Sequence, residues 1–232
     1  MKGDIKAGMN LGNFYFNHKK CKKAEKILTP IAQQGFPRTL LILGDTYRVM
    51  KKEAEAIECL VKASENGEVE ALYLLGMIYH DKNITKAKEY YKAAAAEGYE
   101  RAQAMLGIIY FELSDYKTAR HYYELAALNN EPTALYNLAY METKEGNYKK
   151  ARNLFEESLL AYKNTYGIEH TKTARLLRDL GDVYLLQNHI EIAENYLNQT
   201  LRIFGQNTHP ESYTCLENFS RLTYKKVNIV KQ

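Results

Sequence analysis

A short block of residues recurs along this chain at a nearly constant interval. Every copy but the fifth reads leucine, a small residue and, three positions later, tyrosine, as in Leu43, Gly44 and Tyr47. The small residues lie 31 or 32 positions apart until the last interval, which is 42 positions; they are Gly12, Gly44, Gly76, Gly107, Ala139 and Gly181. Self-similarity at such a period is typical of repeat proteins, whose stacked units bury a joint core.

A second mark follows each block. An alanine lies twelve positions after the small residue, or eleven in the third copy, and a large apolar residue follows four positions later. The alanines are Ala24, Ala56, Ala87, Ala119, Ala151 and Ala193, and the apolar residues are Leu28, Leu60, Tyr91, Tyr123, Phe155 and Leu197. These spacings are those of one face of an α-helix. A polar turn such as residues 51–53 separates the two stripes, so each unit is predicted to be a hairpin of antiparallel helices.

The recurring glycine has a packing explanation. Glycine inside a helix costs about 1 kcal/mol relative to alanine, so its repeated use needs a compensating contact. We expect Gly44 to let the second helix of its hairpin approach closely, and Tyr47 to fill the space one turn further on. A single hairpin cannot bury its own apolar face, so several must stack.

These marks together resemble the tetratricopeptide repeat family over residues 4–226. The chain departs from the usual period of about 34 residues in two ways. The linkers between the early repeats are shorter and resemble those of Sel-like repeats. The resemblance is strongest at residues 94–98, which are followed by Ala102. The later repeats are longer, and Gly167 with His170 is similar to the linkers of the 42-residue repeats of kinesin light chains. Gly205, His209 and Pro210 echo that linker. The resemblance to kinesin light chains implies a repeat geometry and does not imply a role in transport.

The resemblance implies an all-α fold, a right-handed α-solenoid of antiparallel helix pairs. We expect a single superhelical domain over residues 1–232, with a capping helix over about 210–226 whose apolar stripe has no second helix beside it. The six repeats are predicted over residues 5–36, 37–68, 69–99, 100–131, 132–170 and 171–209. The first repeat has no comparable capping helix, which leaves two alternatives open. The chain self-associates at that end, or its first helix needs no cap.

Composition and charge argue against several classes of function and location. The net charge of +4 is too small to indicate nucleic-acid binding in the absence of a clustered basic patch. No run of about 18 apolar residues occurs, so no membrane insertion is expected. The first ten residues lack the apolar segment of a secretory signal, so we expect a cytoplasmic protein.

No residue pattern indicates catalysis or a bound cofactor. Cys21, Cys59 and Cys215 are odd in number and widely spaced, which argues against a disulfide framework or a zinc site. No phosphate-binding loop, serine-hydrolase motif or zinc-protease motif occurs. The histidines lie mostly at predicted turns or helix ends, where an exposed or capping role is usual; they are His18, His80, His121, His170, His189 and His209. We therefore predict that the chain is not an enzyme and binds neither metal nor cofactor.

A partner-binding groove is the predicted functional site. In solenoids of this family the first helix of each pair lines the concave surface, and at 100° per residue the positions facing it lie opposite the repeat leucine. The predicted groove residues are Arg38, Leu41, Asp45, Arg48, Tyr73, Met77, His80, Arg101, Ile108, Phe111, Tyr136, Tyr140, Arg175, Arg178 and Asp182. Aromatic residues and arginine are common anchors of protein interfaces. We therefore expect a partner protein or peptide segment with an apolar centre and acidic flanks.

Three alternatives stay open at this stage. Some groove side chains would instead pack on the first helix of the next repeat. A peptide-sensing regulatory protein would use the same groove but needs a separate output partner. An RNA-binding helical repeat is disfavoured because Glu70, Asp45 and Asp182 lie among the arginines of the predicted face.

Overall fold

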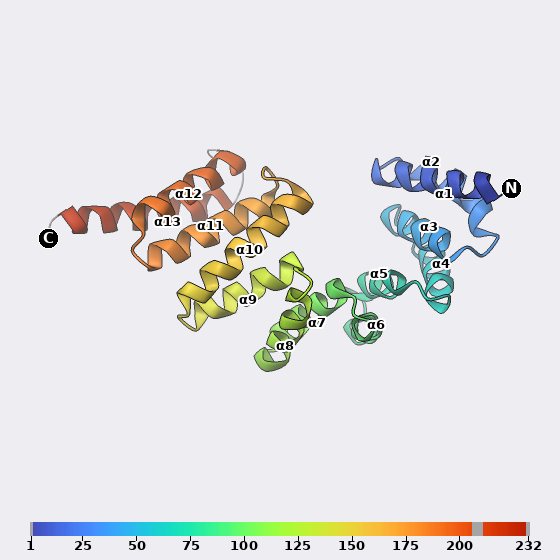
Figure 1. Cartoon of the computed structure of the whole chain (residues 1–232), viewed down its shortest axis with the longest axis horizontal. Helices are drawn as coiled ribbons and strands as arrows, with labels where there is room; N and C mark the ends of the chain where they lie inside the picture. Colours follow the sequence, from blue (N-terminus) through green and yellow to red (C-terminus); the bar gives the residue numbers. More distant parts are fainter. Residues whose placement is uncertain (1, 206–210, 231–232) are drawn as a thin grey trace. The chain divides into compact units, whose positions relative to one another are not determined.

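The computed structural model describes residues 2–205 and 211–230, with the side chains of residues 5–205 and 213–224. Within these residues the chain forms thirteen α-helices and no strand (Figure 1). The predicted all-α architecture of helix pairs is confirmed. The helices are α1 (Lys2–Asn17), α2 (Cys21–Ala32), α3 (Pro37–Val49), α4 (Glu53–Glu65), α5 (Val69–Tyr79), α6 (Ile84–Ala96), α7 (Glu100–Glu112), α8 (Tyr116–Ala127), α9 (Pro132–Lys144), α10 (Tyr148–Tyr166), α11 (Thr171–Leu186), α12 (Ile190–Phe204) and α13 (Glu211–Val230).

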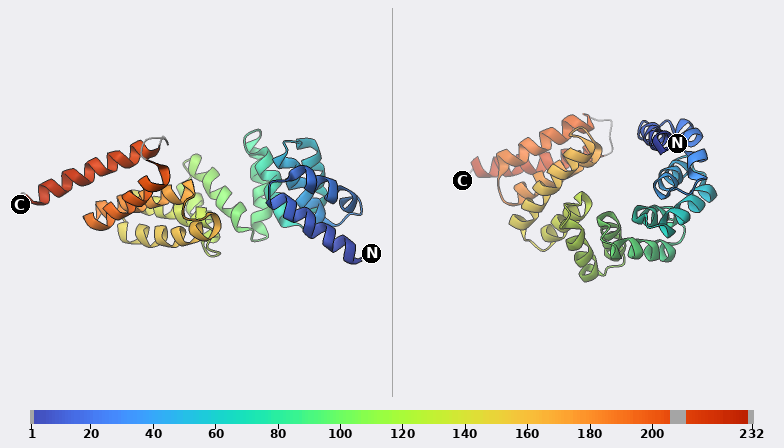
Figure 2. Two further views of the ribbon diagram at one scale, coloured as in Figure 1. Left: turned by 90° about the horizontal axis from the view of Figure 1, so that it is seen from above. Right: turned by 45° about the vertical axis from the view of Figure 1, so that its right-hand side comes forward.

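The helices form two compact units, which are described separately. The N-terminal unit, Met1–Ser114, contains α1 to α7, and the C-terminal unit, Asp115–Gln232, contains α8 to α13. Within each unit, helices that follow one another in sequence pack side by side as antiparallel neighbours (Figures 1 and 2). The predicted repeat boundaries stay a prediction, and the predicted linker residues His209 and Pro210 lie outside the described residues. The single domain over residues 1–232 stays a prediction.

In two hairpins of the N-terminal unit the structure shows the contact that the glycine was predicted to allow. A Cβ atom on Gly76 of α5 would lie 2.6 Å from Cδ1 of Tyr91 on α6, and one on Gly44 of α3 would lie 2.7 Å from Cγ of Leu60 on α4. Tyr91 and Leu60 are fully buried. The large apolar residue of the second helix therefore occupies the space where a side chain on the first helix would be.

Turns between hairpins contain a residue with positive φ just after the second helix ends. Gly67 has φ +89°, and the amide of the next residue, Glu68, donates to the carbonyl of Ala63 at 3.1 Å, which closes the end of α4. Asn130 takes the same place after α8 with φ +54°. Asparagine tolerates this conformation better than other non-glycine residues do.

Turns inside hairpins also contain a left-handed residue, and this was not predicted. It lies seven positions after the repeat's small residue, as at Lys51 with φ +60° and Gly146 with φ +81°; the others are Lys19, Ser114 and Asn188. A non-glycine residue in this conformation costs about 1–2 kcal/mol. The turns at Lys19 and Lys51 thus contain strained backbone.

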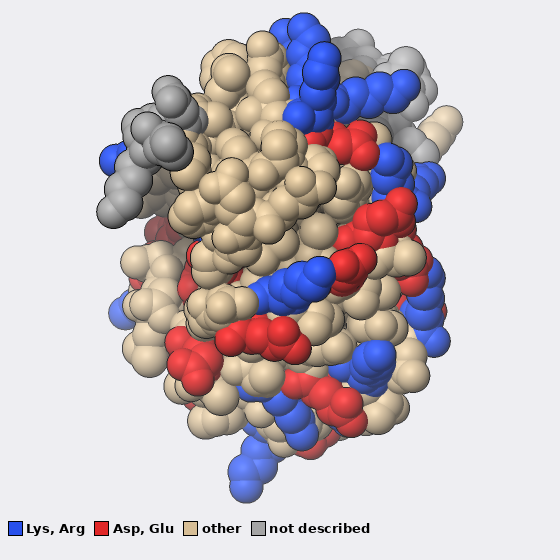
Figure 3. Space-filling model, turned by 90° about the vertical axis from the view of Figure 1, so that its right-hand side faces the viewer, with Lys and Arg blue, Asp and Glu red and all other residues tan. Residues whose placement is uncertain are grey.

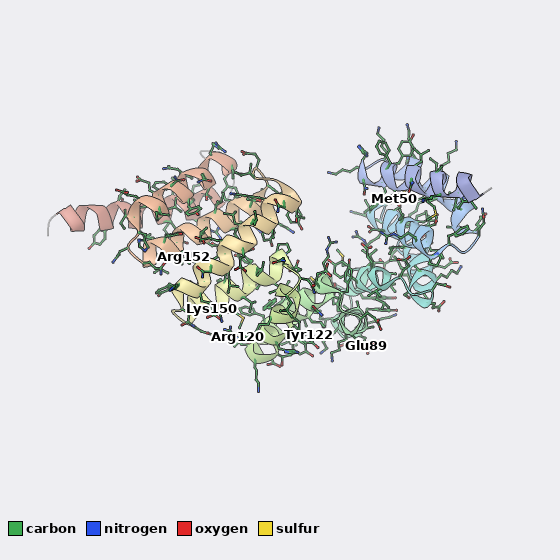
Figure 4. The ribbon with its side chains drawn as sticks, in the orientation of Figure 1. Met50, Glu89, Arg120, Tyr122, Lys150 and Arg152 are labelled. Carbon is green, nitrogen blue, oxygen red and sulfur yellow. The ribbon has the colours of Figure 1, made fainter. Side chains whose placement is uncertain are left out.

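The fifth repeat replaces the motif tyrosine with a buried carboxylate. Glu142 of α9 is 2% exposed and accepts hydrogen bonds from Arg120 of α8 (2.5 Å), Lys150 of α10 (2.7 Å) and Asn147 (2.9 Å). Arg120 and Lys150 are labelled in Figure 4. Burial alone would raise the pKa of Glu142, but the three donors more than offset it and lower the pKa to about 2. Three helices of the C-terminal unit are therefore joined through one carboxylate.

We predict that Glu142→Gln destabilises the C-terminal unit by about 2–4 kcal/mol at pH 7, because Arg120 and Lys150 lose the charge they share. The folded pKa of Glu142 is lowered, so its contribution is present above pH 4.5 and is lost as pH falls toward 2. Urea unfolding at pH 7 and pH 2.5 measures this. Glu145→Gln is the matched control: Glu145 also accepts from Arg120, at 2.7 Å, but is 51% exposed and should matter little. Equal effects of the two variants would contradict the prediction.

We predict that Gly76→Ala destabilises the N-terminal unit by about 1–2 kcal/mol, because overpacking against the buried Tyr91 ring outweighs the gain in helix propensity. Gly181→Ala is the matched variant in the C-terminal unit. Its Cβ would lie 3.3 Å from Cγ of Leu197, so a small shift suffices and the change should be within about 0.5 kcal/mol. Chemical denaturation measures both, and a stabilised Gly76→Ala would show that the close contact is not required.

Candidate functional site

A hollow of about 390 Å³ in the C-terminal unit is the candidate site. Residues of α9, α10, α11 and α13 line it: Tyr140, Thr143, Lys144, Phe155, Asp179, Asp182, Val183, Leu185, Leu186 and Arg221. Helix α10 packs against both α9 and α11, and α11 contacts α13 (Figures 1 and 2). Another hollow, of about 450 Å³, is lined by residues of α12 alone and is more open, so it offers a ligand less enclosure.

Helix α9 contributes an aromatic stripe, because residues four apart lie on one helix face. Tyr140 is 37% exposed, and the Nζ atom of Lys144 lies 5.1 Å from its ring centroid. Tyr136 lies deeper, with its ring edge-on to Phe155 at 5.7 Å between centroids and its hydroxyl donating to Oδ2 of Asp179 at 2.6 Å. Burial, with the nearby Asp179 charge, raises the pKa of Tyr136. Tyr140 is therefore partly exposed at the hollow, whereas Tyr136 supports the packing.

Helix α11 contributes two carboxylates about one turn apart. Arg178 donates to Oδ1 of Asp179 from Nε at 2.9 Å and from Nη2 at 2.8 Å. Because Tyr136 bonds the other oxygen, both oxygens of Asp179 are engaged. Asp179 thus links α9 to α11.

Asp182 has no such partners. Its Oδ1 atom is buried without a hydrogen bond among the described residues, and so is Nδ2 of Asn218 on α13. Asn218 approaches the carboxylate and lowers its pKa slightly without reaching good hydrogen-bonding geometry. Burial, followed by repulsion from Asp179, raises the pKa of Asp182 to about 6, and the charges of Arg178 and Arg221 offset this only in part. The hollow therefore has a carboxylate whose ionisation the fold disfavours.

The predicted groove residues of α3 divide between surface and core. Arg38 is exposed and pairs with Glu70 at 3.2 Å. Asp45 and Arg48 pair with each other at 2.6 Å. Leu41 is only 3% exposed and lies in the core of the N-terminal unit, so its prediction as a partner-contacting residue is wrong. It is buried because α3 packs against both α1 and α5, which leaves this position no solvent-facing side.

The predicted residues of α5 and α7 are mostly half-buried. The Tyr73 ring lies 5.9 Å from that of Tyr91 on α6, the second helix of its own hairpin. Met77 is 37% exposed, and Nδ1 of His80 is buried without a hydrogen bond among the described residues. Of the three predicted residues on α7, one is exposed and two are half-buried: Arg101, Ile108 and Phe111.

The structure brings four predicted residues to the hollow or its immediate support. Tyr140 and Asp182 line it, and Tyr136 and Arg178 hold Asp179 in place. Arg175 is exposed on α11 but is not part of the lining. The remaining predicted residues belong to the N-terminal unit.

Sequence reasoning missed Asp179, Lys144 and Arg221. Lys144 follows Tyr140 by four positions, so extending the aromatic stripe by one helical turn would have found it. Asp179 lies at a position that the helical offset directed away from the groove. Arg221 reaches the hollow only because α13 folds back on α11 and α12, which no local pattern encodes.

Two further features of the described residues bear on function. No cluster of three or more histidine, cysteine, aspartate or glutamate side chains there could hold a metal ion. None of the described helices combines the length and the apolar character needed to cross a membrane.

Family models match the chain over two adjoining segments. One tetratricopeptide repeat model matches residues 130–206, and a second tetratricopeptide repeat model matches residues 100–131. The chain therefore contains tetratricopeptide repeats over residues 100–206. The predicted family resemblance is therefore confirmed. None of the curated proteins matches the chain in sequence.

Solved structures share the fold of this tetratricopeptide repeat protein at low sequence identity. PilF of Pseudomonas aeruginosa is 18% identical with a TM-score of 0.74, over 94% of this chain and 98% of PilF. A Sel1 repeat protein of Oxalobacter formigenes is 19% identical with a TM-score of 0.69, over 85% of this chain and 87% of that one. The protective antigen c5321 of uropathogenic Escherichia coli, which has an SLR fold, is 21% identical with a TM-score of 0.75, over 97% of this chain. The chain spans half the length of that antigen.

We predict that Asp182→Asn stabilises the C-terminal unit by about 1–2 kcal/mol at pH 7.5. The folded pKa of Asp182 is raised from 3.8 to about 6, so the parent is penalised at neutral pH and gains stability as pH falls from 6 toward 4. Asparagine cannot ionise, so its advantage should shrink at pH 4.5. Urea unfolding at both pH values measures the difference.

Asp179→Asn is the matched control for this prediction. It removes the charge that Arg178 and Tyr136 share, so it should destabilise the unit at both pH values. An Asp182→Asn effect that is the same at pH 7.5 and pH 4.5 would contradict the prediction.

Proposed function

We propose that this tetratricopeptide repeat protein is an interaction scaffold that holds a segment of a partner protein. The repeat fold is typical of protein–protein interaction. The observation that carries the proposal is the hollow between α9, α11 and α13, in which aromatic, aliphatic and charged side chains meet. Such a combination, with an aromatic residue beside arginine, is characteristic of the anchor positions of protein interfaces.

The proposed partner segment is extended or helical, with an apolar centre and acidic flanks. Tyr140, at 37% exposed, and Leu186, at 50% exposed, offer apolar surface at the hollow. Lys144 and Arg221 line the same hollow and supply positive charge. Acidic residues on either side of the residue that enters the hollow would pair with these cations and fix the direction of the segment.

The distribution of charge supports a protein partner over a nucleic acid. On the face drawn in Figure 3, lysine and arginine lie among aspartate and glutamate rather than in one continuous basic area. The net charge of only +4 is small for a protein that binds a phosphate backbone.

We predict that Tyr140→Ala reduces capture of the partner from the native host at least tenfold, because truncating an aromatic anchor typically removes about 2 kcal/mol of binding free energy. Tyr136 is left unchanged, since its contacts to Phe155 and Asp179 are structural. Affinity capture quantified by mass spectrometry measures the loss, and circular dichroism checks that helicity is retained.

Tyr224→Ala is the matched control for this experiment. Tyr224 is 72% exposed on α13, in the same unit, but does not line the hollow. Partners lost with Tyr140→Ala and retained with Tyr224→Ala support the proposal. Captured proteins that are the same for Tyr140→Ala and the parent would refute it.

A further inference from the structure

The hollow in the C-terminal unit has one polar end and several apolar walls. Its walls are formed by the Tyr140 ring and by aliphatic side chains of α11: Val183, Leu185 and Leu186. Its polar end contains Asp182, whose buried Oδ1 atom accepts no hydrogen bond among the described residues. A buried acceptor without a donor is destabilising, so its presence in a cavity calls for a functional explanation.

The other charges around Asp182 do not replace a donor. On α11, Arg178 is committed to Asp179 through two hydrogen bonds, at 2.9 and 2.8 Å. On α9, Lys144 lies over the Tyr140 ring. On α13, Arg221 is exposed and acts on Asp182 through its charge. Arg178 and Arg221 therefore act on the Asp182 carboxylate through their charge, Asp179 repels it, and Asn218 approaches it without completing a hydrogen bond to Oδ1.

The shape and chemistry of the hollow match one class of side chain. A basic residue has a flexible aliphatic stem, which suits apolar walls, and a charged end that donates several hydrogen bonds. The stem would lie along Leu185 and Leu186, and the charged end would meet the carboxylate. Lys144 and Arg221 would then favour acidic residues at neighbouring positions of the same segment, which agrees with the acidic flanks proposed above.

We propose that the hollow binds a lysine or arginine side chain of the partner segment, with its charged end at Asp182 and its stem along the apolar walls. This proposal adds a specific ligand to the proposed function. It rests on the proposed function in one respect, which is that the basic side chain belongs to a protein partner. A neutral apolar anchor would leave Asp182 as unsatisfied as it is in the unbound chain.

Small probes test the hollow without a known partner. The full chain, labelled with ¹³C at valine and leucine methyl groups, is titrated with n-butylammonium, which mimics a lysine side chain, and separately with n-butanol and butyrate. Butylammonium should produce saturable shifts at Val183, Leu185 and Leu186, with an affinity at least fivefold higher than that of butanol or butyrate. Asp182→Asn should lower the butylammonium affinity at least fivefold and leave the butanol affinity unchanged.

A matched control separates the hollow from general attraction of cations to acidic surface. Glu191 lies on α12 and is exposed outside the hollow, so Glu191→Gln should not change the butylammonium affinity. Equal binding of butylammonium and butanol, or full binding to Asp182→Asn, would overturn this inference and leave an apolar or water-filled hollow. The titration reports on the hollow alone, so it can succeed or fail independently of the partner capture with Tyr140→Ala.

Discussion

Close contact between the two helices of a hairpin is the constraint on which the rest of the structure depends. In the third repeat the absent side chain of Gly76 is what admits the buried Tyr91 ring, and Gly44 does the same for Leu60. Because the two helices of a hairpin lie this close together, the apolar faces of neighbouring helices bury one another, and the polar residues lie in the turns. At the hollow, α13 packs against α11 and α12 and adds Arg221 to the lining.

Helix positions could be predicted because the signals that set them are local. Gly67 and Asn130 mark the helix ends through their tolerance of positive φ, and the predicted repeat starts at residues 37, 100 and 132 fall within the first turn of a helix. The left-handed Lys51 was missed for the opposite reason. Lysine carries no preference for that conformation, so only the closed turn between two packed helices imposes it.

The site was harder to predict because exposure depends on neighbours that are distant in sequence. A helical offset treats every position opposite the repeat leucine alike, yet Leu41 is buried between α1, α3 and α5 while Tyr140 is exposed at the hollow. Arg221 lines the hollow only because α13 packs back against α11 and α12. Glu142 could be recognised as a departure from the repeat, but its meaning needs Arg120 and Lys150 from two other helices, and sequence alone does not pair them.

Asp179 and Asp182 show how one helix can use the same side chain for opposite purposes. Asp179 has a donor for each oxygen, and so it connects α9 to α11 and stabilises the fold. Asp182, three residues later, faces the hollow with a buried oxygen that no described donor satisfies, and burial raises its pKa to about 6. A carboxylate in that state opposes folding at neutral pH, while Glu142 in the same unit shows that the chain can satisfy a buried acid fully. The acid without a hydrogen-bond donor, Asp182, therefore lies at the cavity wall, whereas Asp179 and Glu142 have their donors and lie between helices. This arrangement is expected when a protein is less stable at a binding site because the partner supplies the hydrogen bond that the unbound site lacks.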